Sequence, residues 1–133
     1  MPPDQLPPFA KLIGIVIKEI SPDIVRAEVL VREDHNNRHG IMHGGAIMAL
    51  ADHCGGMATS ANLRPDQMTT TIESKTNFFS AVQIGEVVTA ESTPLHRGRT
   101  TMVWQTRITR PNGKLAALVT QTQLVMPRPA KGE

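Results

Sequence analysis

Two glycines, Gly44 and Gly45, begin a segment whose apolar residues recur at helical spacing. The first N–H groups of a helix have no intrahelical acceptor, and the helix dipole is positive there. Glycine also lets a ligand approach the backbone closely. A donor aimed at a developing oxyanion contributes about 3–4 kcal/mol to catalysis. The pair is consistent with such a site, and equally with a tight loop-to-helix junction.

A lone carboxylate lies in the middle of the same segment. Asp52 has no Lys or Arg three or four residues away to form a helical ion pair. Aspartate is a poor helix-interior residue, and an isolated carboxylate on a buried helix is costly unless it is paired or used in chemistry. Asp52 is therefore a candidate functional residue. The alternative is a carboxylate that points into water from an exposed helix edge.

Metal and thiol chemistry are less well supported. His35, His39 and His43 are spaced by four, which on a helix would suit zinc, but Gly40 and the neighbouring asparagines predict a loop. We therefore expect no metal site. The only cysteine, Cys54, lies on the apolar stripe of the predicted helix and is expected to be a buried structural thiol.

The composition excludes several classes of function. The chain has 133 residues, a net charge of +2 and a pI near 9.0, with 3% aromatic residues and no Tyr. Proteins that read single-stranded nucleic acid stack bases on aromatic side chains, and DNA-binding surfaces carry more charge. No apolar run reaches the roughly 20 residues that cross a bilayer, and no signal-peptide pattern begins the chain. We expect a cytoplasmic protein that binds neither nucleic acid nor a membrane.

The elements that must position these residues follow from periodicity. An apolar stripe predicts one long helix from about residue 45 to residue 62. Strand-like segments cover residues 12–20, 24–32, 69–79, 86–95, 100–109 and 115–125. Asn112-Gly113 predicts a hairpin with a type I′ turn. Since one helix cannot cover both faces of six strands, we expect an α+β fold in which a curved antiparallel sheet wraps around it.

The expected domain covers residues 12–126, between a proline-rich arm (1–11) and a short tail (127–133). Because bulky rings are scarce, we expect the core to combine a helix of small residues with an aliphatic sheet.

The order Asn37, His43-Gly44-Gly45 and Asp52, on a loop leading into a long helix, resembles the hotdog-fold acyl-CoA thioesterases. The most similar branch is typified by the phenylacetate-pathway thioesterase. The resemblance covers residues 12–126 and includes the Phe79-Ser80-Ala81 and Gly85-Glu86 junction and the turn from His96 to Thr100. Two positions depart from the pattern, because Ala81 stands where relatives often carry Pro and Glu73 adds an acid near Thr71.

The resemblance implies a role for four catalytic residues. The Gly44 N–H would bind the thioester carbonyl, and Asn37 would orient substrate or water. Asp52, supplied by the opposing subunit, would act as the nucleophile or as the general base for water. Thr71 would position the lytic water. A thioester is already activated, so a carboxylate and a polarising amide suffice without a triad or a metal.

The resemblance also implies that coenzyme A is carried as part of the substrate and product. Arginine favours bidentate phosphate contacts, so Arg97 and Arg99 would face the CoA phosphates, although an ordinary solvated turn is the alternative. The complete set of expected substrate-binding residues is His43, Gly45, Phe78, His96, Arg97, Gly98, Arg99 and Thr100.

These observations predict an acyl-CoA thioesterase that hydrolyses an aryl or a short- or medium-chain acyl-CoA to the free acid and CoA. The site would lie between subunits of a homodimer, itself half of an expected homotetramer, and would use no cofactor. One alternative is a hotdog dehydratase acting on 3-hydroxyacyl or enoyl thioesters, with His43 or His53 as acid–base group. Another is a non-catalytic acyl-CoA-binding module.

Overall fold

A computed structural model describes residues 5–129 of the chain. It contains a short helix, two strands, a long helix and four further strands. In chain order these are α1 (Pro8–Ile13), β1 (Val16–Ile20), β2 (Val25–Leu30), a 3₁₀ turn (Glu33–His35), α2 (Gly44–Ser60), β3 (Gln67–Phe78), β4 (Val87–Arg97), β5 (Thr101–Thr109) and β6 (Leu115–Pro127). None of the described helices is long and apolar enough to cross a membrane.

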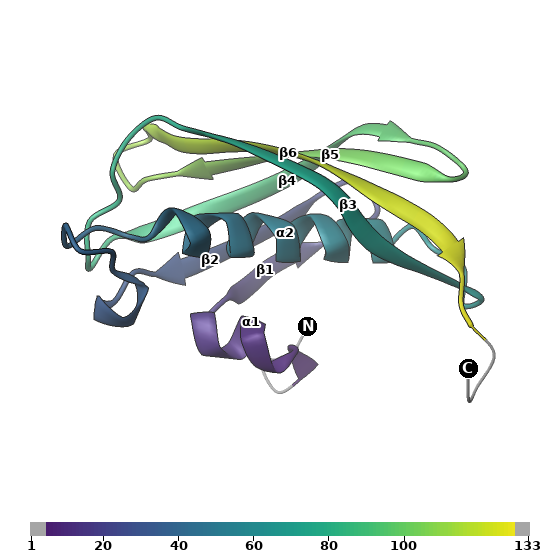
Figure 1. Cartoon of the computed structure of the whole chain (residues 1–133), viewed down its shortest axis with the longest axis horizontal. Coiled ribbons are helices and arrows are strands. Elements are labelled where there is room, and N and C mark those ends of the chain that lie inside the picture. Colours follow the sequence, from purple (N-terminus) through teal and green to yellow (C-terminus); the bar gives the residue numbers. More distant parts are fainter. Residues whose placement is uncertain (1–4, 130–133) are drawn as a thin grey trace.

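The six strands form one antiparallel sheet in the order β1-β2-β4-β5-β6-β3. The sheet curves around α2, which lies along its concave face (Figure 1). The predicted α+β arrangement of six strands around one long helix is confirmed. β1 and β3 are the two edge strands, and each has one side without a strand partner in residues 5–129.

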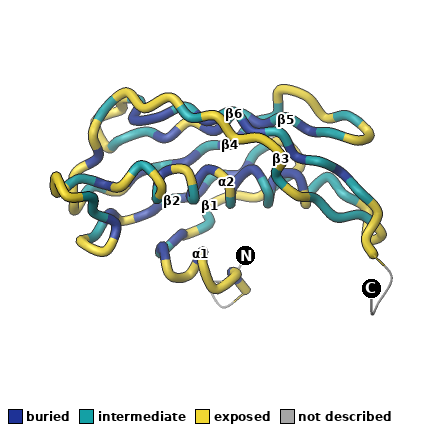
Figure 2. The backbone as a smooth tube through the Cα atoms, viewed as in Figure 1, coloured by how far each residue is buried: buried dark blue, intermediate teal, exposed yellow. Residues whose placement is uncertain are grey.

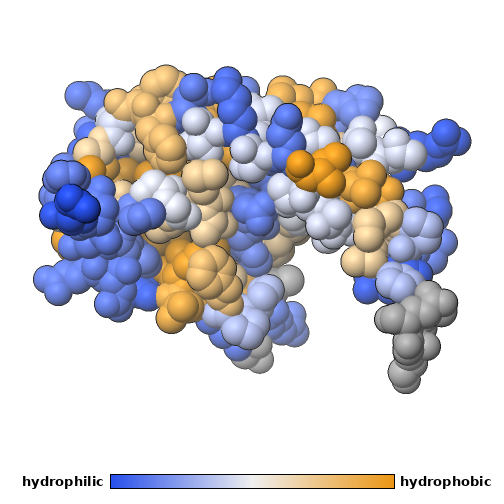
Figure 3. All heavy atoms as spheres, in the orientation of Figure 1, coloured by the Kyte–Doolittle hydropathy of each residue, from blue (hydrophilic) through white to orange (hydrophobic). Residues whose placement is uncertain are grey.

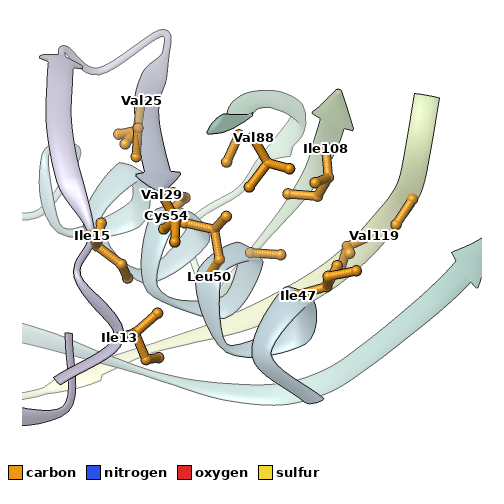
Figure 4. Close-up of a cluster of buried hydrophobic side chains, with 14 of the residues drawn as sticks. Ile13, Ile15, Val25, Val29, Ile47, Leu50, Cys54, Val88, Ile108 and Val119 are labelled. Atoms are coloured by element: carbon orange, nitrogen blue, oxygen red, sulfur yellow. The ribbon is translucent and has the colours of Figure 1, made fainter. Parts of the chain in front are cut away.

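The core lies between α2 and the concave face of the sheet, where buried and less buried residues alternate along β2 and β5 (Figure 2). The predicted apolar stripe of the helix is confirmed, because Ile47, Leu50, Ala51, Cys54 and Ala58 are all buried. They pack against aliphatic side chains such as Val29, Val88, Ile108 and Val119 (Figure 4). The sheet therefore holds α2 along its full length.

The strand predicted over residues 12–20 is wrong in its first part. Residues 8–11 of the predicted arm, with Leu12 and Ile13, form α1, which ends at Gly14 with a left-handed φ of 85°. Pro8 at the first helical position has its φ already set for a helix, and this outweighs the β-branched residues that follow. Ala10 and Ile13 are buried, so α1 packs on the domain. Residues 1–4 of the arm and 130–133 of the tail lie outside the described residues.

The hairpin predicted at Asn112-Gly113 is present, but its turn is not type I′. Only Gly113 has a positive φ, 83°, and its N–H donates to the Arg110 carbonyl at 2.9 Å. Pro111 has a fixed negative φ and occupies the second position of a type I turn, with the glycine following. The proline that precedes the Asn-Gly pair therefore determines the turn type.

Helix α2 approaches the sheet closely at Gly55, which is buried against the side chain of Gln121 on β6. A Cβ atom at position 55 would overlap the Gln121 amide, whereas a Cβ at Gly56 would have no neighbour within 4 Å. The two adjacent glycines therefore have different roles, and only the first is required by packing.

We expect Gly55→Ala to lower the free energy of unfolding by about 1–3 kcal/mol because the added methyl group overpacks the helix–sheet contact. Gly56→Ala is the matched control and should raise stability by about 0.5–1 kcal/mol through helix propensity alone. Urea unfolding at one protomer concentration measures both. Equal effects of the two substitutions would show that the Gly55–Gln121 contact does not limit packing.

Candidate active site

The first turn of α2 leaves one backbone amide free. His43 is the N-cap residue, and its Nδ1 accepts a hydrogen bond from the Gly45 N–H at 2.8 Å. The N–H groups of Ala46 and Ile47 donate to the His43 carbonyl at 3.0 and 3.2 Å. Within residues 5–129 no group accepts from the Gly44 N–H. The cap therefore satisfies its neighbours and leaves the Gly44 amide available to a ligand.

The Gly44 amide borders a hollow of about 350 Å³ with mostly apolar walls, which include Ile47 and Phe78. A Cβ at Gly44 would lie 3.1 Å from Cζ of Phe78, so glycine lets this ring lie directly against the helix start. Asn37 also lines the hollow, but its Oδ1 accepts from the His39 N–H at 2.8 Å. The Nδ2 group of Asn37 is therefore the one available to orient a substrate.

The Asp52 carboxylate lies two turns further along α2 and is exposed in the single chain, as the alternative interpretation of its position allowed. It is nevertheless held in place. Its Oδ1 accepts from the Thr71 hydroxyl at 2.7 Å and from Nε2 of Gln121 at 3.3 Å. Asp52 and Thr71 both line a second hollow, of about 630 Å³, together with Gln123. The structure thus brings together two of the four predicted catalytic residues.

Gln121 and Gln123 were not predicted from the sequence. They occupy successive inward positions of β6, between the buried Val119 and Val125, and are themselves 0% and 1% exposed. Two amides at positions where the alternation calls for apolar residues were the signal that could have identified them.

One chain does not bring Gly44 and Asp52 together. They are eight residues apart on one helix, which at 1.5 Å per residue separates them by about 12 Å along its axis. They line different hollows. β3 runs alongside α2 in the opposite direction, with Phe78 against Gly44 and Thr71 against Asp52. A carbonyl bound at Gly44 is therefore out of reach of Asp52 on the same chain.

The predicted phosphate-binding turn lies apart from both hollows. The guanidinium of Arg97 donates to the Asp23 carboxylate at 2.8 Å and to the Pro22 carbonyl at 2.9 Å, tying the turn to the β1–β2 hairpin. Arg99 and Thr100 line another hollow, of about 270 Å³. Of the two arginines, Arg99 is the one that the described side chains leave without an ion pair. Phosphate binding by Arg97 and Arg99, and substrate binding by His96, Gly98 and Thr100, stay predictions.

His35 and the Cys54 thiol are buried, and His53 is half-buried beside Asp52 in the larger hollow. His35 is buried, its Nδ1 accepts from the Arg32 N–H at 3.1 Å, and its Nε2 lies 2.7 Å from the Ile13 carbonyl. Cys54 is fully buried, and burial raises the pKa of its thiol to about 12. Burial also lowers the pKa of His53, an effect that the charge of Asp52 opposes. In residues 5–129 no three His, Cys, Asp or Glu side chains form a cluster suited to a metal ion.

Comparisons with known proteins identify the family and the fold. The model of the thioesterase superfamily matches residues 39–117, more than half of the chain. A 1,4-dihydroxy-2-naphthoyl-CoA hydrolase from Listeria monocytogenes is 29% identical over 80% of this chain and 85% of its own length. A thioesterase from Haemophilus influenzae is similar in structure, with a TM-score of 0.87 and 28% identity, over 94% of this chain and 87% of that one. The structure of AziG from S. sahachiroi has a TM-score of 0.89 at 26% identity and covers 93% of this chain and 100% of its own.

The chain therefore has the hotdog fold and belongs to the thioesterase superfamily. It is an enzyme of the thioester hydrolase class. Membership of the phenylacetate-pathway branch stays a prediction.

Proposed function

We propose that this protein is an acyl-CoA thioesterase whose site combines Gly44 of one chain with Asp52 of a second copy. The observation that carries the proposal is the Gly44 N–H at the start of α2, which has no acceptor among residues 5–129 and belongs to a residue that lines a largely apolar hollow. A thioester presents a carbonyl oxygen to such a donor and an acyl chain to such a hollow.

The reaction needs few groups. The Gly44 N–H and the positive end of the helix dipole stabilise the oxyanion that forms as the carbonyl carbon is attacked. Asp52 either removes a proton from the attacking water, or attacks the carbonyl carbon itself to form a mixed anhydride that water then hydrolyses. The thiolate of CoA leaves and takes up a proton, and the free acid is released. Asn37 orients substrate or water through its Nδ2 group.

The requirement for a second copy follows from the spacing along α2. Met48 is midway between Gly44 and Asp52, and on the neighbouring β3 the midpoint between Phe78 and Thr71 falls at Ser74 and Lys75. A two-fold axis passing close to both midpoints would set Gly44 of each copy opposite Asp52 of the other. One axis therefore assembles two equivalent sites.

β3 offers the surface for this contact. It is a 12-residue edge strand, and Ile72 and Phe78 on it are 55% and 53% exposed. Figure 3 shows hydrophobic side chains exposed over β3 and over α1. Long edge strands with exposed apolar side chains are rare in monomers because they pair with another chain. We propose that β3 of a second copy covers this edge, while the expected tetramer stays a prediction.

For the substrate we propose an aryl or a short- or medium-chain acyl-CoA. Phe78 and Phe79 both line the hollow at Gly44, where they would contact an aromatic or aliphatic acyl group. The Listeria monocytogenes relative is a 1,4-dihydroxy-2-naphthoyl-CoA hydrolase, and its aromatic acyl group supports the same class.

A panel of aryl-, short- and medium-chain acyl-CoAs, with thiol release as readout, tests the activity.

Asp52→Asn should lower kcat by about 10²–10⁴-fold, the usual contribution of a general base, with little change in thermal stability. The buried Cys54 should not contribute to the thiol signal of the native protein. Loss of enoyl absorbance without thiol release would support the dehydratase instead, and wild-type kcat in Asp52→Asn would exclude the proposed role of this carboxylate.

Gly44→Pro and Gly44→Ala together isolate the contribution of the amide proton. Both add a Cβ against Phe78, but only proline removes the N–H. Proline is tolerated at the first helical position, and the ψ of 136° at His43 already suits a following proline. We expect kcat of Gly44→Pro to be about 10²–10³-fold below that of Gly44→Ala, the cost of losing one oxyanion donor. Equal kcat values would contradict the assignment.

Mixing two inactive variants tests the shared site. Chains carrying Asp52→Asn and chains carrying Gly44→Pro are unfolded together and refolded in equal amounts, and each is refolded alone as a control. Half of the dimers are then mixed, and each contains one intact site, so activity should return to about one quarter of the wild-type value. If light scattering shows that dimers have formed but no activity returns, both groups act from one chain.

A further inference from the structure

The Asp52 carboxylate is connected to a group of polar side chains below it, which we call the glutamine network: Thr69, Thr71, Gln121 and Gln123. Nε2 of Gln121 donates to Oε1 of Gln123 at 2.9 Å, and Nε2 of Gln123 donates to the Thr69 hydroxyl at 3.1 Å. The Thr71 hydroxyl lies 2.6 Å from Oε1 of Gln123 and 2.7 Å from Oδ1 of Asp52. The network therefore joins α2, β3 and β6 at the carboxylate.

This arrangement costs stability. Gln121 and Gln123 lie on the concave face of the sheet at positions whose neighbours Val119 and Val125 are apolar. Oε1 of Gln121 is buried with no hydrogen-bond partner in the described part of the chain. Room for this amide also requires a glycine at position 55 of the facing helix. Apolar side chains here would avoid the desolvation of two amides, so core packing alone does not account for the pair.

The single proton of the Thr71 hydroxyl, shared between two acceptors, indicates the function of the glutamine network. The Thr71 hydroxyl has one proton and two oxygen acceptors within 2.7 Å, Oδ1 of Asp52 and Oε1 of Gln123. When Asp52 is a carboxylate, the hydroxyl donates to it. When Oδ2 of Asp52 has taken up a proton, Oδ1 is a carbonyl oxygen and a weaker acceptor, and the Thr71 proton turns to Oε1 of Gln123. Each state has an acceptor for the Thr71 proton, and rotation of the hydroxyl exchanges one acceptor for the other.

The orientation of the Gln123 amide is fixed by both of its ends. Its Oε1 accepts from Gln121 while its Nε2 donates to Thr69, so the oxygen faces Thr71. Gln121 also donates to Oδ1 of Asp52. Both bonds to the carboxylate from the network use Oδ1, and among the described residues Oδ2 has no partner. The oxygen left free is the one that can meet water or a thioester.

We infer that Gln121 and Gln123 are positioning residues for the hydrolysis. They hold Asp52 by Oδ1 and give the Thr71 proton an acceptor in the step where Asp52 takes a proton from water. In that step the water O–H bond breaks, its proton passes to Oδ2 of Asp52, and the hydroxide oxygen bonds to the thioester carbon while the C=O π pair moves onto the carbonyl oxygen. The C–S bond then breaks, the carbonyl re-forms and the CoA thiolate leaves. The inference rests on the proposed function and adds to it two residues that do not touch the substrate.

The first test is kinetic and uses Gln123→Met, which keeps the length of the side chain but removes both polar atoms. We expect kcat to fall about 10- to 100-fold, within the range of general-base effects, with KM changed less than about twofold. Gln105→Met on β5 is the matched control, because Gln105 is half-buried and lies outside the network. It should keep wild-type kcat. Wild-type kcat in Gln123→Met, or an equal loss in Gln105→Met, would overturn the inference.

Coupling to Thr71 separates a positioning role from a structural one. Thr71→Ser keeps the hydroxyl and should retain most of kcat, while Thr71→Val should lose as much as Gln123→Met. Because both act through one hydroxyl, the double variant Thr71→Val/Gln123→Met should lose no more than either single variant. If the two losses in kcat multiply in the double variant, or if the losses follow the melting temperatures of the variants, a positioning role is contradicted.

A crystal structure of Gln123→Met gives a readout that does not depend on turnover. We expect the Asp52 carboxylate to leave the single position that it has in the wild-type protein. An unmoved carboxylate still bonded through Oδ1 would overturn the inference. Absence of thiol release by the wild-type protein across the acyl-CoA panel would instead overturn the proposed function, so the two failures are distinguishable.

Discussion

The fixed spacing along α2 is the constraint on which the site depends. Packing in the concave sheet keeps the helix from bending, so the Gly44 amide and the Asp52 carboxylate stay about 12 Å apart in one chain. Leu50, which lies between them on the helix, is fully buried and is part of the core that holds α2 against the sheet. In the arrangement that we propose, symmetry solves this problem, because a rigid helix placed antiparallel to its copy brings both groups together twice. The same spacing that separates the groups in one chain then determines the geometry between two.

The close approach of helix and sheet depends on small residues. The structure also shows where the few aromatic residues lie, which the composition alone did not. The expectation that rings would not fit the core is wrong for Trp104, which is fully buried on β5. It holds for Phe9, Phe78 and Phe79, which are all more than half exposed. Two of these phenylalanines line the hollow beside Gly44. In this chain the phenylalanines therefore lie at the surface, two of them beside the candidate site, while aliphatic side chains and one tryptophan fill the interior.

Periodicity predicted most of the fold because it reports directly on which side of an element is buried. The helix and the last four strands were placed to within about two residues, the usual uncertainty of element ends. It failed at Leu12 and Ile13, because a continuous apolar run suits a strand and a short helix equally, and Pro8 decides between them. The motif from Asn37 to Asp52 could be identified because its residues are close in sequence. The alternation along β6 could mark Gln121 and Gln123 as unusual, but it could not connect them to Asp52. Only the pairing of β3 with β6, which sets Thr71 opposite Gln123, brings them to that residue.

The buried glutamines explain why a carboxylate on an exposed helix edge is compatible with catalysis. Exposure alone would leave Asp52 free to rotate, with water hydrogen-bonded to both of its oxygens. Two hydrogen bonds to Oδ1 from groups anchored in the sheet remove that freedom on one side only. The cost is carried by the core, in an unpaired Gln121 oxygen and in a glycine required at position 55. The Asp52 carboxylate is thus held in place by buried glutamines, at positions where an apolar pair would make the domain more stable.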